Sequence, residues 1–341
     1  MNTTITSLEK KHFPVMLNEV IETCLSINKD LLIVDCTFGG GGYSKGFLKL
    51  PKVNVNVIAI DRDKTATNRA KSLEKSFPKN FTFYNEKFSN LDKVIKKENK
   101  PDAIIFDLGL STFQLQDYSR GFSFKSNEKI DMQMGLSEIS AEEVINTFDE
   151  KKLKLIIKIL GEEQEAGRIA KNIIRARILK KINTVTDLVR IIELSKKKNY
   201  NKKINVCTKT FQALRIFVNK ETTELIEGLI KASQIIKLGG KIIVISFHSI
   251  EDKIIKYYFT NYSSNKSNPS RYMPTENNQK NSFFEKYKNN FLTPSPEELI
   301  KNPASRSAKL REAVRTKQEF IYPEEFKEKF KKYIDIENAA I

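Results

Sequence analysis

Runs of apolar residues alternate with helix-like segments along the first third of the chain. Four short runs are almost continuously apolar, which is typical of buried strands. They are LLIVDCT (31–37), VNVIAIDRD (55–63), FTFYNEKFS (81–89) and DAIIFDLGLS (102–111). Near-continuous apolar strands that alternate with helices indicate a parallel sheet covered by helices on both faces.

The pattern becomes mostly helical between residues 114 and 209. Ser140 is expected to cap a helix here, with Glu143 completing a capping box. The apolar run KIIVISFHS (241–249) then returns a strand to the sheet. We therefore predict an α/β, doubly wound sheet with an inserted helical domain.

The predicted boundaries follow from these changes of pattern. Residues 1–113 form the first part of the sheet domain, 114–209 form the inserted helical domain, and 210–341 form the second part of the sheet domain. Asn, Ser and Lys dominate much of 261–296, so this segment is expected to be a long flexible loop.

The chain is strongly basic, and this narrows the class of partner. Its 341 residues include 59 Lys and Arg against 42 Asp and Glu, a formal net charge of +17. Such an excess favours a polyanion, nucleic acid ahead of a membrane surface. The alternative is that lysine is simply this chain's usual polar residue.

The cysteines and the apolar runs indicate the cellular compartment in which the protein is expected. The three cysteines form no CxxC pair, which argues against a zinc site or a disulfide framework and favours the reducing cytoplasm. The polar start, MNTTITSLEKKHF, is unlike a signal peptide, and no apolar run is long enough to span a membrane. We therefore expect a cytoplasmic protein with no membrane partner.

A glycine-rich turn and several acids fall at the carboxyl ends of the predicted strands, where open parallel sheets bind ligands. Four glycines follow Asp35, at positions 39–42, and Asp61 and Asp107 end later strands. G-x-G-x-x-G fails in both registers, because Ser44 or Lys45 stands where the third glycine is required, and no P-loop lysine follows.

A nucleoside ligand without pyrophosphate fits this pattern best. Asp61 lies about 20 residues beyond the turn, where an acid commonly binds the two ribose hydroxyls. S-adenosyl-L-methionine is the common ligand of this kind. The competing interpretation is that Asp35 caps the following helix and Asp61 is a solvated strand end.

A set of ordered motifs extends this interpretation over nearly the whole chain. They are HFPVMLNEV (12–20), DCTFGGGGYS (35–44), AIDRD (59–63), FDLGLSTFQLQDYSRGFSF (106–124), IDMQM (130–134), GEEQEAGRIAKNI (161–173), TFQALRIFVNKE (210–221), GGKIIVISFHSIEDKIIK (239–256) and NPASRSAKLREAVR (302–315). Together they resemble the RsmH (MraW) family of S-adenosylmethionine-dependent ribosomal RNA methyltransferases.

The resemblance implies a fold, an activity and partners. The fold is a class I (Rossmann-like) methyltransferase domain with an inserted helical domain. The activity is methylation of the exocyclic N4 of a cytidine in the decoding region of small-subunit (16S) ribosomal RNA, with S-adenosyl-L-methionine as methyl donor. The partner is small-subunit ribosomal RNA or the assembled small subunit. The oligomeric state stays open, a homodimer included.

The resemblance also implies the residues of a cofactor site. Asp61 would bind the ribose, Phe88 would lie near the adenine, and Asp107 and Gln114 would lie near the methionine end. The glycine turn would contribute Gly41, Gly42 and Tyr43. This chain departs from the family where Tyr43 replaces a histidine, Gly40 an arginine and Lys209 an arginine.

Three residues are candidates for catalysis. Asp107, at the tip of the fourth strand, would accept a hydrogen bond from the cytosine amine or would serve only the amino group of the cofactor. His248 and Ser249 follow the next strand and would contact the base or take up the released proton, although a lone histidine is often structural. No metal site is predicted.

Two basic segments are expected to contact RNA, 168–181 and 301–317, each with six Lys or Arg residues. The alternative for each is a solvated helix face. Three other functions fit the sequence less well than a methyltransferase. A DNA amino-methyltransferase typically has the motif D/N/S-P-P-Y/F/W where this chain has DLGL. A ribosome assembly factor that binds RNA without catalysis would not need Asp61 and Asp107. A dehydrogenase is disfavoured because the glycine spacing of a dinucleotide site is absent.

Overall fold

The computed structural model describes residues 14–27, 30–96, 98–196, 205–264, 282–285 and 287–339. The start of the first motif, His12 and Phe13, and residues 265–281 of the expected loop lie outside these ranges. The elements, in chain order, are α1 (Leu17–Leu25), β1 (Asp30–Asp35), α2 (Gly42–Leu48), β2 (Asn54–Ile60), α3 (Ala66–Ser76), β3 (Phe81–Tyr84), the 3₁₀ helix η1 (Phe88–Asn90), α4 (Leu91–Val94), β4 (Ala103–Asp107), α5 (Thr112–Gln116), η2 (Tyr118–Arg120), α6 (Ala141–Thr147), α7 (Glu150–Leu160), α8 (Ala166–Leu179), α9 (Val185–Ser195), α10 (Thr208–Asn219), α11 (Glu221–Ile235), β5 (Lys241–Ser246), α12 (Ser249–Asn261), α13 (Pro296–Lys301), η3 (Pro303–Ser307), β6 (Lys309–Val314) and α14 (Glu324–Asn338).

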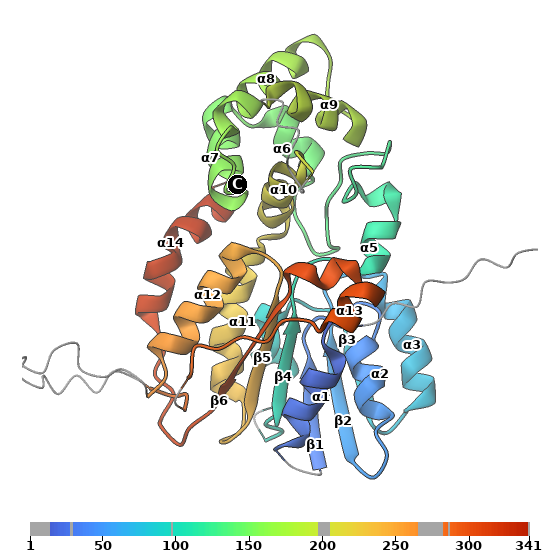
Figure 1. The fold of residues 1–341 in the computed structure, drawn as a ribbon, viewed down its shortest axis with the longest axis vertical. Helices are drawn as coiled ribbons and strands as arrows, with labels where there is room; N and C mark the ends of the chain where they lie inside the picture. The colour runs from blue at the N-terminus through green and yellow to red at the C-terminus, as the bar shows by residue number, and fades with distance from the viewer. Residues whose placement is uncertain are drawn as a thin grey trace, which may run out of the picture.

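One mixed sheet organises the first and last parts of the chain (Figure 1). Its strand order is β3-β2-β1-β4-β5-β6, with β1 to β5 parallel and β6 antiparallel to β5. The chain places β2 and β3 on one side of β1 and then places β4 and β5 on the other side of β1. This reversal creates a crevice beyond the carboxyl ends of β1 and β4, where ligands of such sheets bind.

Helices cover both faces of the sheet, as the continuous apolar strands predict. Along β4, Ala103 and Ile105 pack in one core with residues of α1, α2 and α3, while Ile104 and Phe106 pack in the other core with α4, α11, α12 and α14. Because successive strand residues point to opposite faces, a strand buried on both sides must be apolar at every position. The α/β doubly wound fold class is confirmed.

A separate core holds the helical region that stands above the sheet in Figure 1. Its buried apolar residues run from Phe122 to Val218 and come mainly from α6 to α10. Ser140 caps α6, and Glu143 completes the capping box, as predicted. Since Phe211, Leu214 and Phe217 of α10 are in this core, it extends beyond the expected boundary at residue 209.

The last helix, α14, joins the two regions along one flank of the molecule (Figure 1). Phe326 and Phe330 belong to a core of the sheet, whereas Ile336 belongs to the helical core. The buried carboxylate of Glu337 accepts hydrogen bonds from the backbone N–H groups of Thr222 and Thr223, at 3.0 and 2.8 Å. It therefore fixes the first turn of α11, which borders the site described below.

Part of the expected flexible loop packs firmly. Phe283 and Phe284 are fully buried, and the N–H of Phe284 donates to the carbonyl of Tyr262 at 2.9 Å. Leu292 pairs with Leu310 of β6 through two hydrogen bonds of 2.9 Å. The expectation of a loop throughout 261–296 is wrong for these residues, because two adjacent aromatic rings complete the core under α12.

The second basic segment is likewise not a helix face. Residues 309–314 form β6, where Arg311 is buried and donates to Asp252 and to the hydroxyl of Tyr287, at 2.7 and 2.8 Å. Arg315 is also buried and donates to the carbonyl oxygen atoms of Ser233 and Phe283. These two arginines are therefore structural, which removes them from the basic residues expected to contact RNA.

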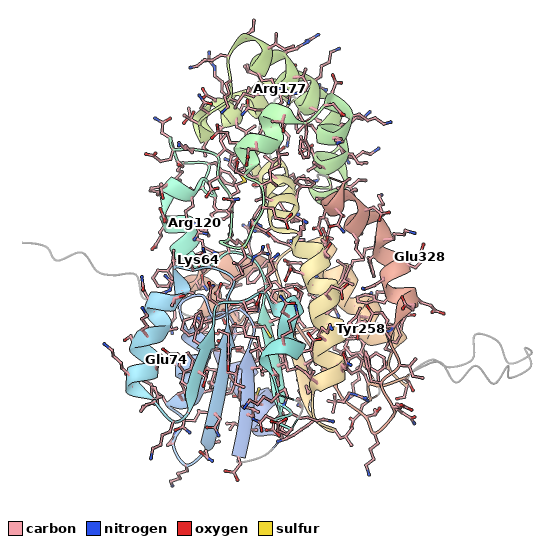
Figure 2. All side chains as sticks on the ribbon, turned by 180° about the vertical axis from the view of Figure 1, so that it is seen from behind. Lys64, Glu74, Arg120, Arg177, Tyr258 and Glu328 are labelled. Atoms are coloured by element: carbon pink, nitrogen blue, oxygen red, sulfur yellow. The ribbon has the colours of Figure 1, made fainter. Side chains whose placement is uncertain are left out.

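Other charged side chains project from the outer surface, as Figure 2 shows for Glu74 and Glu328. Arg177 lies on α8, whose basic side chains Lys171, Arg175 and Lys180 are exposed. No helix in the described parts of the chain is both long and apolar enough to cross a membrane.

Candidate active site

A cavity of about 370 Å³ lies at the carboxyl ends of β1, β2, β4 and β5. The glycine turn, the end of β2, the end of β4 and the segment that follows β4 form its walls. Residues of α10 and α11 close it from the side of the helical region. Its volume is that of a small-molecule site, and its position is the one that the strand order predicts.

The glycine turn is shaped by backbone conformation and by two aromatic rings. Gly39 and Gly41 have φ values of +51° and +74°, which other residues adopt at a cost. A Cβ on Gly41 would lie 2.7 Å from the ring of Phe38, and one on Gly40 would lie 2.7 Å from the ring of Phe113. Gly40 and Gly42 line the cavity and Gly41 does not, so Gly41 serves the turn and the other two border the ligand space.

Asp61 lies in the cavity wall beside this turn. One carboxylate oxygen accepts a hydrogen bond from the N–H of Gly39 at 2.6 Å, and the other accepts from the N–H of Asp63 at 2.8 Å. Burial raises the pKa of Asp61 to about 6, although these two hydrogen bonds lower it. Each oxygen keeps a second lone pair, so Asp61 can still accept hydrogen bonds from a ligand.

Asp107 ends β4 and also lines the cavity. Its backbone N–H donates to the hydroxyl of Thr37 at 2.7 Å, which fixes its position. Its Oδ1 atom is buried and accepts no hydrogen bond from the described part of the chain. Burial raises the pKa of Asp107 well above the ordinary value, and the nearby Asp35 raises it further, whereas the nearby hydroxyl of Tyr43 lowers it. A buried acceptor without a donor is a site where a ligand donor would be stabilised.

Tyr43 and Phe88 lie in the cavity wall on either side of these acids. Tyr43 is buried, and its hydroxyl donates to the carbonyl of Val15, so the side chain ties the turn to the residues before α1. Phe88 is half-buried and packs edge-on against Phe106, with ring centres 5.3 Å apart. Gly228 allows this contact, since a Cβ there would lie 2.6 Å from the ring of Phe88.

Gln114 lines the cavity but its polar atoms are engaged. Its side-chain oxygen accepts from the N–H of Ser111 at 2.9 Å, and its side-chain nitrogen donates to Asp63 at 2.8 Å. Asp63 also accepts from Arg120. Burial alone would raise the pKa of Asp63, but Arg120 and Gln114 together hold it below the ordinary value. Gln114 therefore positions the wall of the cavity.

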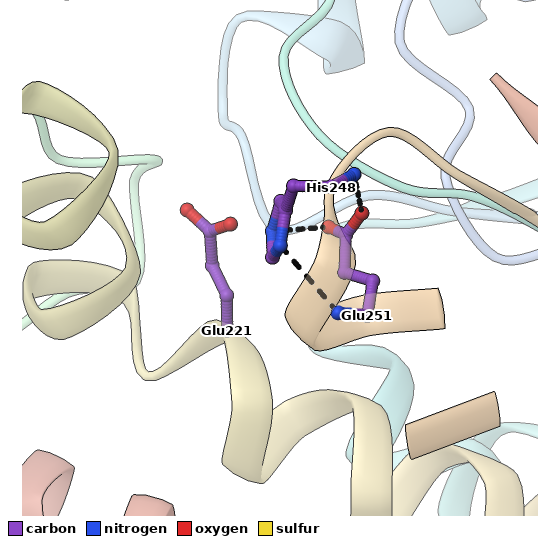
Figure 3. A group of neighbouring side chains, drawn as sticks. All are labelled: Glu221, His248 and Glu251. Atoms are coloured by element: carbon purple, nitrogen blue, oxygen red, sulfur yellow. Dashed lines mark hydrogen bonds and ion pairs between the residues drawn. The ribbon is translucent and has the colours of Figure 1, made fainter. Parts of the chain in front are cut away.

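The two other catalytic candidates lie differently from expectation. Neither His248 nor Ser249 is among the described residues that line the cavity. His248 is the N-cap of α12, and its Nε2 lies 3.0 Å from a carboxylate oxygen of Glu251 (Figure 3). Ser249 is exposed and donates to Glu162. His248 is thus turned toward the first turn of α12 and Ser249 toward Glu162, so neither side chain reaches the cavity where the base was expected.

The sequence interpretation missed a charged group on the far wall. Arg215 donates to both carboxylate oxygens of Glu221, each at 2.8 Å, and both residues line the cavity. Burial alone would raise the pKa of Glu251, but His248 and Arg215 hold it below the ordinary value. Glu221, His248 and Glu251 lie close enough to ligate a cation, yet the Arg215 fork occupies both oxygens of Glu221.

Comparison with known proteins identifies the family. The profile of the MraW methylase family matches residues 9–316. The chain belongs to the MraW methylase family. This methylase is 40% identical to the Ribosomal RNA small subunit methyltransferase H of Bartonella bacilliformis over 307 residues, 90% of each chain. It is also 40% identical to the protein of that name from Bartonella grahamii over 312 residues, 92% of each chain.

A structure of an rRNA methylase from Streptococcus thermophilus aligns with 90% of this methylase and 100% of its own chain. The TM-score is 0.40 and the sequence identity is 10%, a likeness too distant to inform on the site. Family membership confirms the resemblance read from the ordered motifs. The chain is therefore a methyltransferase that uses S-adenosyl-L-methionine as its methyl donor.

The cavity of this methylase fits that donor. Asp61 retains lone pairs for hydroxyl groups, Phe88 offers an aromatic ring, and the orphaned Oδ1 of Asp107 offers an acceptor for the amino group of the donor or of the substrate. Gly40 and Gly42 line the cavity, and their lack of a Cβ lets Phe113 and Pro14 pack closely against the turn. The residues that hold the cofactor are proposed below.

Proposed function

We propose that this methylase transfers a methyl group to the exocyclic N4 of a cytidine in the decoding region of small-subunit (16S) ribosomal RNA. The observation that carries the proposal is the buried, unpartnered Oδ1 of Asp107 in the wall of the cavity. The curated relatives named Ribosomal RNA small subunit methyltransferase H support the choice of substrate. The net charge of +17 supports a polyanionic partner.

The cofactor would be held by the residues at the strand ends. Asp61 would accept the hydrogen bonds of the ribose hydroxyls, because its carboxylate is already oriented by two backbone N–H groups. Phe88 would contact the adenine through its half-buried ring. The turn at Gly40–Tyr43 would hold the methionine part, with Gln114 fixing the opposite wall through Asp63.

Asp107 would accept a hydrogen bond from the amine of the target cytosine. The lone pair of this amine is delocalised into the ring, and an acceptor on its N–H localises the pair and stabilises the positive charge that develops on nitrogen. When bound, S-adenosyl-L-methionine supplies a methyl group already activated by a sulfonium sulfur. Transfer forms the N–C bond, breaks the C–S bond and leaves the nitrogen with one proton to lose.

The carboxylate of Asp107 would receive this proton. Burial raises its pKa well above the ordinary value, which makes the ionised form a stronger base than an exposed carboxylate. While the cytosine is bound, the hydrogen bond that its amine donates to Asp107 favours the ionised form of this carboxylate. The Arg215–Glu221 pair would hold the far wall rigid, so that the base and the methyl group stay in line.

The partner would be the small subunit or its RNA, and the target base would have to leave its stack to reach the cavity. The exposed basic side chains of α8 remain a predicted RNA contact. The sequence leaves the oligomeric state open. Sedimentation of the purified chain would show whether it forms a homodimer.

The proposal is tested by transfer of a tritiated methyl group to small subunits from cells that lack the modification, followed by nucleoside analysis. We expect label in N4-methylcytidine at one position. Duplex DNA and subunits that already carry the modification are the controls and should stay unlabelled. Label in another nucleoside, or only in DNA, would overturn the substrate assignment.

The affinity for S-adenosyl-L-methionine should fall as the pH is lowered through about 6. Burial raises the pKa of Asp61 to about 6, and the ionised carboxylate is the form that accepts from two hydroxyl groups at once. Protonation therefore competes with binding below this pH. Calorimetric titration between about pH 5 and pH 8 would measure the effect. The variant Asp61→Asn does not titrate in this range and should bind S-adenosyl-L-methionine more weakly at every pH. If the affinity of both proteins changes equally with pH, Asp61 is excluded as the group that causes the pH dependence.

A further inference from the structure

A group of apolar side chains remains exposed beside the cavity. Phe113 and Leu115 of α5 and Tyr118 of η2 are 41%, 39% and 51% exposed. We call these three side chains the platform. Since α5 and η2 follow each other directly, the platform is one continuous stretch of chain, and Figure 1 places α5 beside the junction of the sheet and the helical region.

The segment that carries the platform forms part of the cavity wall. Leu115 itself lines the cavity, and so do Ser111 and Thr112 from the same segment. The ring of Phe113 touches the glycine turn, since a Cβ on Gly40 would meet it at 2.7 Å. Phe113 and Leu115 therefore adjoin the wall that would hold the methyl donor, and Tyr118 follows them along the chain.

Cationic side chains accompany the platform. The Arg69 guanidinium lies 4.6 Å from the centre of the Phe113 ring, and its Nε donates to the carbonyl of Gly39 at 2.8 Å. Arg120 follows Tyr118 by two residues and binds Asp63, and Lys64 is exposed next to that acid; Figure 2 labels both basic residues on this flank. Asp63 is thus already paired, and the exposed Asp117, which directly precedes Tyr118, accepts from the N–H and the hydroxyl of Ser119.

We propose that the platform stacks a nucleotide of single-stranded ribosomal RNA that flanks the target cytidine. Every base presents a π face, so exposed aromatic rings bind single strands with little dependence on sequence. Arg69 over Phe113 and the surplus of positive charge favour a polyanion with aromatic bases over a protein surface. A base unstacked from its neighbour would leave that neighbour with one exposed face, which the platform would cover.

This inference rests on the proposed function, because it assumes an RNA substrate at the same cavity. It adds a residue-level claim: Phe113 and Tyr118 bind RNA and do not bind the methyl donor. Phe113 also touches the glycine turn, so its removal could disturb the donor site. Tyr118 makes no such contact through its side chain in the described ranges, and it is the cleaner probe.

The test uses the full chain and the variants Phe113→Ala, Tyr118→Ala and the double variant. Affinity for a short fluorescent single-stranded RNA, affinity for S-adenosyl-L-methionine and kcat/KM on unmodified small subunits are measured. We expect each single variant to lose about 10-fold in RNA affinity and in kcat/KM, and Tyr118→Ala to keep its donor affinity. Tyr118→Phe and Phe113→Trp should restore binding, since stacking needs a ring and no hydroxyl.

Tyr322→Ala is the matched control, because Tyr322 is 38% exposed and lies just before α14. It should behave as the wild type. The platform is excluded if the double variant binds RNA and methylates subunits like the wild type, or if Tyr118→Ala loses donor affinity in parallel. The platform is also excluded as an RNA site if the wild type is a dimer and the double variant is a monomer, because the rings would then bind a second copy of the chain. A wild type that does not methylate subunits refutes the proposed function alone, since the RNA affinities still test the platform.

Discussion

Asp107→Ala should lower kcat for methyl transfer by about 100- to 1000-fold. The substitution removes the acceptor that stabilises charge on the target amine, and loss of one such preorganised group typically costs this much. It also removes the proposed receiver of the proton. Single-turnover transfer to unmodified subunits, at saturating donor, would measure the chemical step separately from binding.

Asp107→Asn is the matched variant, because its amide keeps the size and one acceptor but can take no proton. We expect its kcat to lie between those of the wild type and the alanine variant, or to be as low as that of the alanine variant. The dissociation constant of S-adenosyl-L-methionine should change by less than about 3-fold. If the donor dissociation constant instead rises in step with the loss of rate, then Asp107 binds the amino group of the cofactor. A kcat near that of the wild type would remove Asp107 from the mechanism.

The parts of this site that could be predicted from sequence are those fixed by strand ends. Asp61 and Asp107 directly follow or end apolar runs, and parallel strands bring their carboxyl ends to one edge whatever the intervening helices do. The fold class followed from the same runs. The capping box at Ser140 followed from another local pattern, the acid three residues after a serine. The roles given to these acids remain proposals.

The parts that could not be predicted depend on contacts between distant segments. Arg215 and Glu221 are six residues apart, but their place in the cavity wall depends on how the helical region sits over the sheet. Arg311 looked like a surface charge because its partners, Asp252 and Tyr287, come from other elements. A count of basic residues in a segment cannot separate paired from free arginines.

His248 illustrates a different limit. Its place after a strand suggested a side chain over the ligand, yet a helix starts at the next residue, and the ring turns to that helix as an N-cap. The triplet His248, Ser249 and Glu251 carries this signal, since an acid three residues after a capping position often completes a capping box. Glu251 lines the cavity, whereas His248 does not.

Asp61→Ala should raise the dissociation constant of S-adenosyl-L-methionine by about 10- to 100-fold, while kcat at saturating donor stays within about 3-fold. A hydrogen bond to an ionised group contributes about 1.5–3 kcal/mol, and the two ribose hydroxyls would share this carboxylate. Part of the loss would arise because the N–H of Gly39 loses its partner and the glycine turn loosens.

Isothermal titration of the purified chain would measure the constant, and thermal unfolding without ligand would report the loosening. Glu74→Ala is a suitable control, since Glu74 is an acid on the outer helix α3 and does not line the cavity. It should leave the donor affinity unchanged. An unchanged dissociation constant in Asp61→Ala would mean that the ribose is held elsewhere, and the acid would then serve only to shape the turn between β1 and α2.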